Sequence, residues 1–373
     1  MASSSPPLDL MIGQMLLAGF RDYSVDETSP IVKDIRDRHL GGVILYDYDM
    51  VLDQPQRNIK DPEQVKALIQ SLQSYAQVPL FIGVDQEGGN VQRLKPEYGF
   101  TGTPSAQVLG TLNDTEIQAA ATITGQTLKS VGFNLNFAPV VDVLHLDSPA
   151  IGKRGRSFSS GPERIGHCAR LFLEVFNEQA IIGCLKHFPG HGSATEDSHY
   201  GWTDVTQTWS EAELIPYRKL VASGLVDMVM TAHTFNAQLD PVYPATLSKA
   251  VITDILRKQI GFNGVVITDD MSMQAITDVY GQTKAIRLAI EAGVDILLIG
   301  NNQVYDPDSV SQAHAIIKKL VEEQTISQQR IEQSYERILN LKAKRFGTSG
   351  SVQGSTKPLS FDDKTRACEY FKR

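Results

Sequence analysis

Short apolar runs alternate with longer amphipathic segments along almost the whole chain. The apolar runs are rich in Val, Ile and Leu, as expected of buried parallel strands, and they span residues 15–20, 41–46, 80–84, 134–143, 180–185, 226–232, 264–268 and 294–299. Helix-length segments separate or follow them, at residues 31–38, 62–76, 115–131, 162–179, 249–260, 283–292, 308–323 and 327–344. Because strands that alternate with helices pair in parallel, the pattern predicts an α/β fold.

The number of strands distinguishes two parallel architectures. Eight strand–helix units over about 340 residues predict a closed (β/α)8 barrel, the TIM barrel, in a single domain at residues 8–346. A doubly wound open sheet is the alternative, but no GxGxxG motif follows the first strand. Residues 347–356 are rich in Gly and Ser, so we expect residues 347–373 to be a C-terminal extension.

Composition narrows the class of protein. The 373 residues are 42% hydrophobic and 21% charged, as is typical of soluble globular proteins, and the net charge of −8 argues against a nucleic-acid partner. The three cysteines lack CxxC spacing, which disfavours a disulfide framework and favours a reducing compartment. No apolar run approaches the roughly 20 residues of a membrane span, and the N-terminus lacks the basic region of a signal peptide. We therefore expect a cytoplasmic protein without a membrane partner.

Polar side chains follow the expected strands at the points where those strands end. They are Asp85, Asp142, Lys186, His187, His233, Asp269 and Asp270. Each residue alone has an ordinary explanation, since a lone Asp often caps a helix and a lone His is often a hydrogen-bonded interior residue. Their coincidence favours a shared pocket, because the C-terminal strand ends of a barrel meet on one face.

The mixture of side chains narrows the chemistry of that pocket. Carboxylates beside Lys and Arg suit hydrogen bonding to sugar hydroxyls, and a carboxylate nucleophile with an acid/base residue is what retaining glycoside hydrolysis requires. A metal-dependent hydrolase is the alternative, with candidate ligands at His187, His191, His199, His233 and Asp269. The spacing does not support it, because the chain has neither an early HxH nor an HExxH motif. We expect no metal and no cofactor.

Four motifs resemble known sequences. Residues 255–259 and 264–272 (ILRKQ and GVVITDDMS) resemble the active-site signature of glycoside hydrolase family 3. Residues 186–192 (KHFPGHG) with 197–199 (DSH) are similar to the β-N-acetylglucosaminidase branch of that family, as are 85–93 and 151–158. The resemblance covers roughly residues 10–345, in order, with Asn90 standing where Arg is commoner.

The resemblance implies roles for individual residues. Asp269 corresponds to the nucleophile, His199 to the general acid/base and Asp197 to the residue that orients it. Larger family members take a Glu acid/base from a second domain, and the roughly thirty residues after Lys344 are too few for one, which directs the role to the loop at 193–200. The residues implied to hold the terminal sugar are Asp85, Arg93, Arg156, Lys186, His187 and, with less support, His233. We expect His191 to be a loop or core residue.

The sequence thus predicts a retaining, exo-acting β-N-acetylglucosaminidase. Its expected partner is a GlcNAc-terminated oligosaccharide, from muropeptides or chitin, and its expected state is a monomer or weak homodimer. A phosphorylase of the same family, a β-glucosidase or β-xylosidase, and a catalytically silent sugar-binding barrel are the alternatives.

Overall fold

Eight parallel strands form one sheet in the computed structural model, which describes residues 6–55, 57–198 and 201–347. The strands are β1 (Leu16–Gly19), β2 (Gly42–Ile44), β5 (Phe81–Val84), β8 (Leu135–Asn136), β9 (Ile182–Phe188), β11 (Met228–Thr231), β13 (Val265–Ile267) and β14 (Leu297–Ile299). Their order is β13-β11-β9-β8-β5-β2-β1-β14, and the two edge strands meet at a bridge between Ile267 and Ile296. The predicted (β/α)8 barrel is confirmed.

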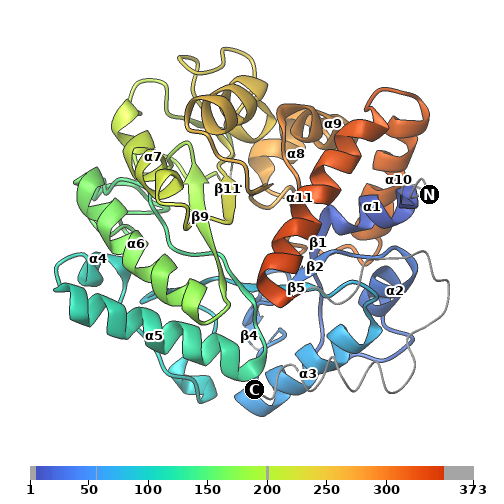
Figure 1. Cartoon of the computed structure of the whole chain (residues 1–373), viewed down its shortest axis with the longest axis horizontal. Helices are drawn as coiled ribbons and strands as arrows, with labels where there is room; N and C mark the ends of the chain where they lie inside the picture. The colour runs from blue at the N-terminus through green and yellow to red at the C-terminus, as the bar shows by residue number, and fades with distance from the viewer. Residues whose placement is uncertain (1–5, 56, 199–200, 348–373) are drawn as a thin grey trace.

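Helices surround the strands (Figure 1). They include α2 (Pro30–Asp37), α3 (Pro62–Tyr75), α5 (Asp114–Val131), α6 (Pro162–Glu178), α7 (Ile215–Ala222), the π-helical η4 (Ala250–Gln259), α8 (Gln274–Tyr280), α9 (Gln282–Ala292), α10 (Ser309–Glu322) and α11 (Gln328–Phe346). Side-chain caps fix the first residues of several of these helices. Asp61 accepts the Gln64 N–H at the start of α3, and Asn113 forms a capping box with Glu116 at the start of α5.

Two expected strands differ from the observed ones. The run at 134–143 pairs regularly only over β8, and then through a single bridge between Val140 and Lys186. Pro139 lies between these pairings and has no N–H to donate to a ladder. The apolar run expected as a strand at 180–185 is shifted in the structure, since β9 begins at Ile182 and ends at Phe188. Lys186 and His187 lie at the C-terminal end of this strand, as the sequence predicted.

Three short strand pairs stand at the C-terminal end of the barrel. They are β3 (Tyr48–Asp49) with β4 (Gln54–Pro55), β6 (Gln86–Gly88) with β7 (Val91–Gln92), and β10 (Thr203–Asp204) with β12 (Thr234–Phe235). The sequence did not predict them, because strands of two or three residues are too short to show a periodicity. They build the walls of the barrel mouth.

The opposite end of the barrel is covered by α1 (Leu8–Gln14) and α11, which pack against each other. Lys342 of α11 is buried there, and its ammonium donates to Gln14 Oε1 and to the carbonyl of Gly41. Across the described residues, we find no helix with the length and apolarity to cross a membrane. The predicted extension at 347–373 lies outside the described residues except for Gly347, so the proposed domain bounds stay a prediction.

Candidate active site

Lys186 is the centre of a buried ion-pair network at the C-terminal end of the barrel. Its Nζ lies 2.7 Å from Asp85 Oδ1 and 2.7 Å from Glu87 Oε1. Burial alone would lower the pKa of this ammonium, but the two carboxylates raise it above its ordinary value. Asp85 and Glu87 directly follow β5, which ends at Val84, and their carboxylates meet Lys186 of β9. Lys186 is therefore a fixed cation with two anionic partners.

Arg156 completes the network from the loop between β8 and α6. Its guanidinium binds Glu87 through two hydrogen bonds of 2.8 Å, to both carboxylate oxygens. Burial would raise the pKa of Glu87, but Arg156 and Lys186 hold it far below its ordinary value. The structure thus brings the predicted Asp85, Arg156 and Lys186 together through Glu87. Sequence reasoning missed Glu87 as a site residue, although it lies in one of the four motifs.

His187 is oriented by Asp142, a fully buried carboxylate in the loop after β8. Asp142 Oδ2 lies 2.7 Å from His187 Nδ1, and its Oδ1 accepts the backbone N–H groups of His187 and His191. These contacts lower the pKa of Asp142 although burial opposes them. An ionised carboxylate only accepts, so Nδ1 carries the proton in this bond. The other nitrogen, Nε2, faces Arg156 Nη2 at 3.3 Å.

Arg93 connects this network to the loop after β2. Its guanidinium lies 3.7 Å from Asp85 Oδ2 and 3.6 Å from Asp47 Oδ1, and Asp47 Oδ2 lies 2.6 Å from Lys95 Nζ. Burial lowers the pKa of Arg93, but the surrounding carboxylates raise it more. The predicted Arg93 is therefore in the site. Asp47 was not predicted, since only the tertiary fold brings it here.

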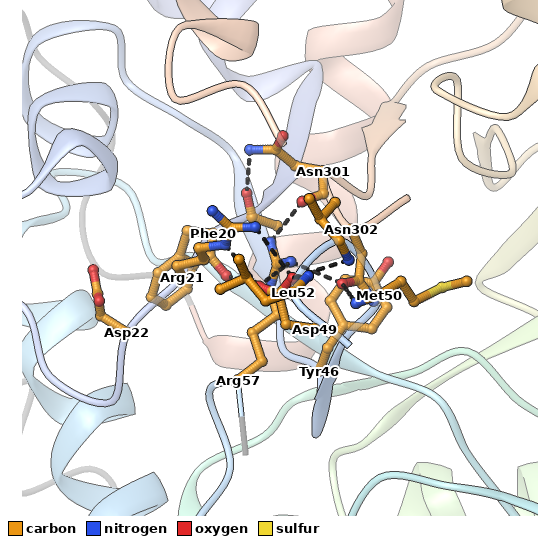
Figure 2. Close-up of polar contacts among 12 residues, drawn as sticks. Phe20, Arg21, Asp22, Tyr46, Asp49, Met50, Leu52, Arg57, Asn301 and Asn302 are labelled. Atoms are coloured by element: carbon orange, nitrogen blue, oxygen red, sulfur yellow. Dashed lines mark hydrogen bonds and ion pairs between the residues drawn. The ribbon is translucent and has the colours of Figure 1, made fainter. Parts of the chain in front are cut away.

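A second cluster, centred on Arg57, lies beside Tyr46 (Figure 2), and the Arg93 guanidinium lies 5.9 Å from the centroid of the same Tyr46 ring. Arg57 follows β4 in the sequence. Its guanidinium donates to the carbonyls of Phe20 and Asn301 and to the side chain of Asn302. These hydrogen bonds connect the loops after β1, β2 and β14. Burial raises the pKa of the Tyr46 phenol well above the ordinary value, and the negative charges of Asp270 and Asp85 add to the effect. Tyr46 is thus close to both carboxylates.

Asp269 follows β13 by two residues and is only partly buried. Its Oδ1 accepts the N–H of Asp270. Burial raises the pKa of the Cys184 thiol on β9, and the negative charges of Asp85 and Asp269 contribute. The carboxylates of Asp85, which follows β5, and Asp269, which follows β13, therefore both raise the pKa of the same buried thiol. The nucleophilic role predicted for Asp269 stays a prediction.

Asp270 has a different role from its neighbour. Its Oδ1 accepts hydrogen bonds from the N–H of Gly300, the N–H of Ser272 and the hydroxyl of Ser272. His233 supports the same segment, because its Nε2 lies 2.9 Å from the carbonyl of Asp270 and its Nδ1 lies 2.8 Å from Thr246 Oγ1. Asp270 and His233 thus hold the backbone on which Asp269 is carried. The predicted sugar contact of His233 stays a prediction.

The loop after β9 carries the predicted acid/base pair. The Asp197 carboxylate is largely buried and lies 3.7 Å from the Arg154 guanidinium. His191 Nε2 lies 3.0 Å from Ser198 Oγ, and burial lowers the pKa of His191 to about 4, so this ring is neutral. His199 lies outside the described residues, and its pairing with Asp197 stays a prediction. Nor does the described part of the chain contain a cluster of three or more His, Cys, Asp or Glu side chains arranged to hold a metal ion.

Comparison with known proteins gives a consistent result. A family model described as "Glycosyl hydrolase family 3 N terminal domain" matches residues 7–341. The beta-hexosaminidase of Tolumonas auensis is 35% identical over 278 residues, which cover 72% of this chain and 78% of that protein. Beta-hexosaminidase A of Pseudoalteromonas piscicida is 30% identical over 381 residues, and the match covers 92% of this chain but only 62% of that protein's length.

The structural comparison agrees with the sequence comparison. The solved structure of a glycoside hydrolase family 3 beta-N-acetylglucosaminidase from Paenibacillus sp. str. FPU-7 superposes with a TM-score of 0.84 at 34% identity. The superposition covers 98% of this chain and 68% of that chain. The overall fold is therefore similar in the two proteins.

Proposed function

This chain belongs to glycosyl hydrolase family 3, since the family model matches residues 7–341, and we propose on that basis that it is a retaining exo-β-N-acetylglucosaminidase. The observation that carries the proposal is the buried network of Asp85, Lys186, Glu87 and Arg156 in the same barrel mouth as the carboxylate of Asp269. The beta-hexosaminidase names of the curated relatives support an N-acetylhexosamine as the terminal sugar.

The network suits the binding of a sugar ring. Asp85 accepts hydrogen bonds, Lys186 and Arg156 donate them, and His187 presents Nε2 toward Arg156 at the same place. The four groups are fixed before substrate arrives, because each has a protein partner within hydrogen-bonding distance. A preorganised set of donors and acceptors binds hydroxyl groups without having to reorganise. We assign this set to the terminal GlcNAc.

The proposed reaction proceeds in two displacements. The Asp269 carboxylate attacks the anomeric carbon and forms a covalent glycosyl ester, while the bond to the leaving oxygen breaks and that oxygen takes a proton from His199. A water molecule then attacks the same carbon, His199 removes its proton and Asp269 leaves, which gives net retention of configuration. In this proposal Asp197 stabilises the imidazolium of His199. The substrates we propose are GlcNAc-terminated fragments of muropeptides or chitin.

We also propose a cytoplasmic location for this activity. The two cysteines among the described residues, Cys168 and Cys184, are both free and buried, which suits a reducing compartment. A cytoplasmic enzyme of this kind would act on sugar fragments that have been taken up, in a recycling role.

Hydrolysis of aryl β-GlcNAc and aryl β-glucose, measured side by side with a chelator present throughout, tests the proposal. We expect a strong preference for GlcNAc, a β-anomer as the first product by NMR, and loss of activity in Asp269→Ala and His199→Ala. Asp254→Ala, an exposed Asp paired with Lys258 on η4, is the matched control and should keep full activity.

Other outcomes identify the alternatives. Hydrolysis of aryl β-glucose at a rate equal to or above that of aryl β-GlcNAc would assign the chain to another branch of the family. It would also contradict the roles proposed for Asp197 and His199. Formation of a sugar 1-phosphate in phosphate buffer would identify a phosphorylase. Activity that returned only with a divalent metal would overturn the mechanism, and GlcNAc binding without turnover would indicate a silent sugar-binding barrel.

A further inference from the structure

Trp202, which is exposed, and Phe235, which is half-buried, form an aromatic pair at the barrel mouth. Their ring centroids are 4.9 Å apart with an interplanar angle of 38°. Trp202 is 38% exposed, whereas Trp209, the other tryptophan of the chain, is 8% exposed. The indole of Trp202 therefore offers a partly exposed apolar face, held in place by Phe235, together with an N–H donor at its edge.

The pairing of β10 with β12 fixes the position of this pair. Thr203 is opposite Thr234 and Asp204 is opposite Phe235. Trp202 directly precedes Thr203, and Phe235 lies two residues after His233. The His233 ring contacts the carbonyl of Asp270, the residue after Asp269. The aromatic pair therefore lies on the rim of the mouth beside the segment that carries the proposed nucleophile.

The pair is next to the ion-pair network, toward β11 in the strand order. That network comes from the ends of β5 and β9 and from the loop after β8, whereas Trp202 directly precedes β10 in the segment after β9 and Phe235 is in β12, after β11. Asp197 lies five residues before Trp202 in the same loop. In the proposed reaction the leaving oxygen is protonated from this loop, so the leaving group extends toward β10 and β12.

We propose that Trp202, supported by Phe235, forms a subsite for the leaving group and binds the apolar face of a second β-linked pyranose ring. The inference rests on the proposed function and adds the substrate class, an oligosaccharide with a sugar ring next to the terminal GlcNAc. Aromatic surfaces with a few polar neighbours are the usual lining of small-ligand sites. Two aromatic side chains bury at most about 250 Å² each, well below the roughly 800 Å² per partner of a stable protein interface. A sugar ring therefore fits the pair better than a protein does.

The test compares two substrates that differ only in the leaving group. N,N′-Diacetylchitobiose has a second pyranose, whereas N-acetyl-β-glucosaminyl fluoride has a leaving group too small to reach Trp202. In Trp202→Ala we expect kcat/KM for the disaccharide to fall about tenfold, mainly through KM, with little change for the fluoride. Trp202→Phe keeps an aromatic ring and should recover most of the loss. Tyr75→Ala, at the end of α3 and at the opposite end of the barrel, should change neither substrate.

Fluorescence provides a readout that does not require turnover. In an Asp269→Ala background, binding of diacetylchitobiose should shift the emission of Trp202, and the shift should vanish in Asp269→Ala/Trp202→Phe, which retains only the buried Trp209. Equal losses on both substrates, or no loss on either, would overturn the inference. A fluorescence shift in a protein whose wild type hydrolyses neither substrate would support the subsite and refute the proposed function.

Discussion

At the scale of single residues, the site depends on charges that are buried in balanced pairs. Lys186 contacts both Asp85 and Glu87, and Arg156 binds Glu87. Ionised groups are costly to bury unless each has a partner, and removal of one member leaves a charge without compensation. The four side chains therefore form one unit, in which Glu87 has partners in both cations.

Glu87→Gln is the sharpest test of this unit, because it keeps the shape and removes the charge. Lys186 would then keep Asp85 as its carboxylate partner, whereas Arg156 would lose the carboxylate that it binds. We expect the free energy of unfolding to fall by about 3–5 kcal/mol and kcat/KM on aryl β-GlcNAc to fall at least about tenfold. Chemical denaturation and steady-state kinetics measure the two effects.

The control for this variant is Glu97→Gln. Glu97 is 66% exposed and lies 3.9 Å from Lys95, so its neutralisation should leave stability and kinetics unchanged. Full activity in Glu87→Gln would mean that the network does not position the sugar-binding groups.

The residues that the sequence missed share one property. Glu87 and Asp142 are the partners of predicted residues, and Asp47 and Tyr46 come from a strand end that carries no motif of its own. The predicted residues were found because each stands at a strand end or in a recognisable motif. A partner is defined by which chain segments meet, and that information exists only in the folded barrel.

At the scale of elements, one buried carboxyl ties two active-site loops to a third segment. Glu213 is in η2 (Glu211–Leu214), and its two oxygens accept the N–H groups of Val143, after β8, and Ser193, after β9. Burial raises its pKa to about 8, the charge of Asp142 adds to this, and the two N–H groups oppose it. The geometry of the loops that carry Asp142 and Asp197 therefore depends on whether the Glu213 carboxyl is protonated.

The raised pKa gives stability a definite dependence on pH. The ordinary pKa of this group is 4.5, and in the folded protein it is about 8, so folding favours the protonated form. Its contribution is complete below pH 4.5 and is lost as the pH rises toward 8. Glu213→Gln removes this pH-dependent contribution to stability. It also leaves one of the two N–H groups without an acceptor at every pH, which lowers the free energy of unfolding by about 1–3 kcal/mol.

We therefore expect Glu213→Gln to be less stable than the wild type at pH 5 and the difference to shrink by pH 9. Thermal unfolding at several pH values measures the difference. The matched control is Glu211→Gln, in the same turn but 81% exposed, which should follow the wild type throughout. A difference that did not change with pH would show that Glu213 is ionised in the folded protein at all of these pH values.

Another ion cluster fastens α11 to the end of the barrel away from the site. The fully buried Asp295, just before β14, lies 2.6 Å from Arg257 of η4 and 3.0 Å from Arg337 of α11, and it accepts the Ser334 hydroxyl. Asp295→Asn should lower the free energy of unfolding by about 3 kcal/mol, because the two partly buried arginines lose the anion with which they pair. Below the melting temperature, kcat/KM should be unchanged. The exposed Asp254→Asn should alter neither quantity, and a loss of activity in Asp295→Asn at low temperature would contradict the separation of the two ends.

At the scale of the whole molecule, the alternation of strands and helices was sufficient to predict the barrel. The short apolar runs and the amphipathic segments are together consistent with one architecture, and the eight predicted strands are all present in order. The hydrogen bonds that close the barrel could not be predicted in the same way. They lie at a join between β13 and β14, where Thr268 N–H donates to the Ile296 carbonyl and the Leu298 N–H donates to Thr268 Oγ1. That second bond uses a side chain, which no periodicity reveals.

The join also sets the position of the proposed nucleophile, since Thr268 directly precedes Asp269. Thr268→Val is close in shape but removes the acceptor of a buried N–H, so we expect the free energy of unfolding to fall by about 1–3 kcal/mol. Because Asp269 is carried by this segment, kcat should fall several-fold at temperatures where the variant is fully folded. Thr268→Ser keeps the oxygen and should retain most of both properties. A Val variant that lost stability but kept its full kcat would mean that the geometry of the nucleophile is set by Asp270 and His233 alone, independently of the closure of the barrel.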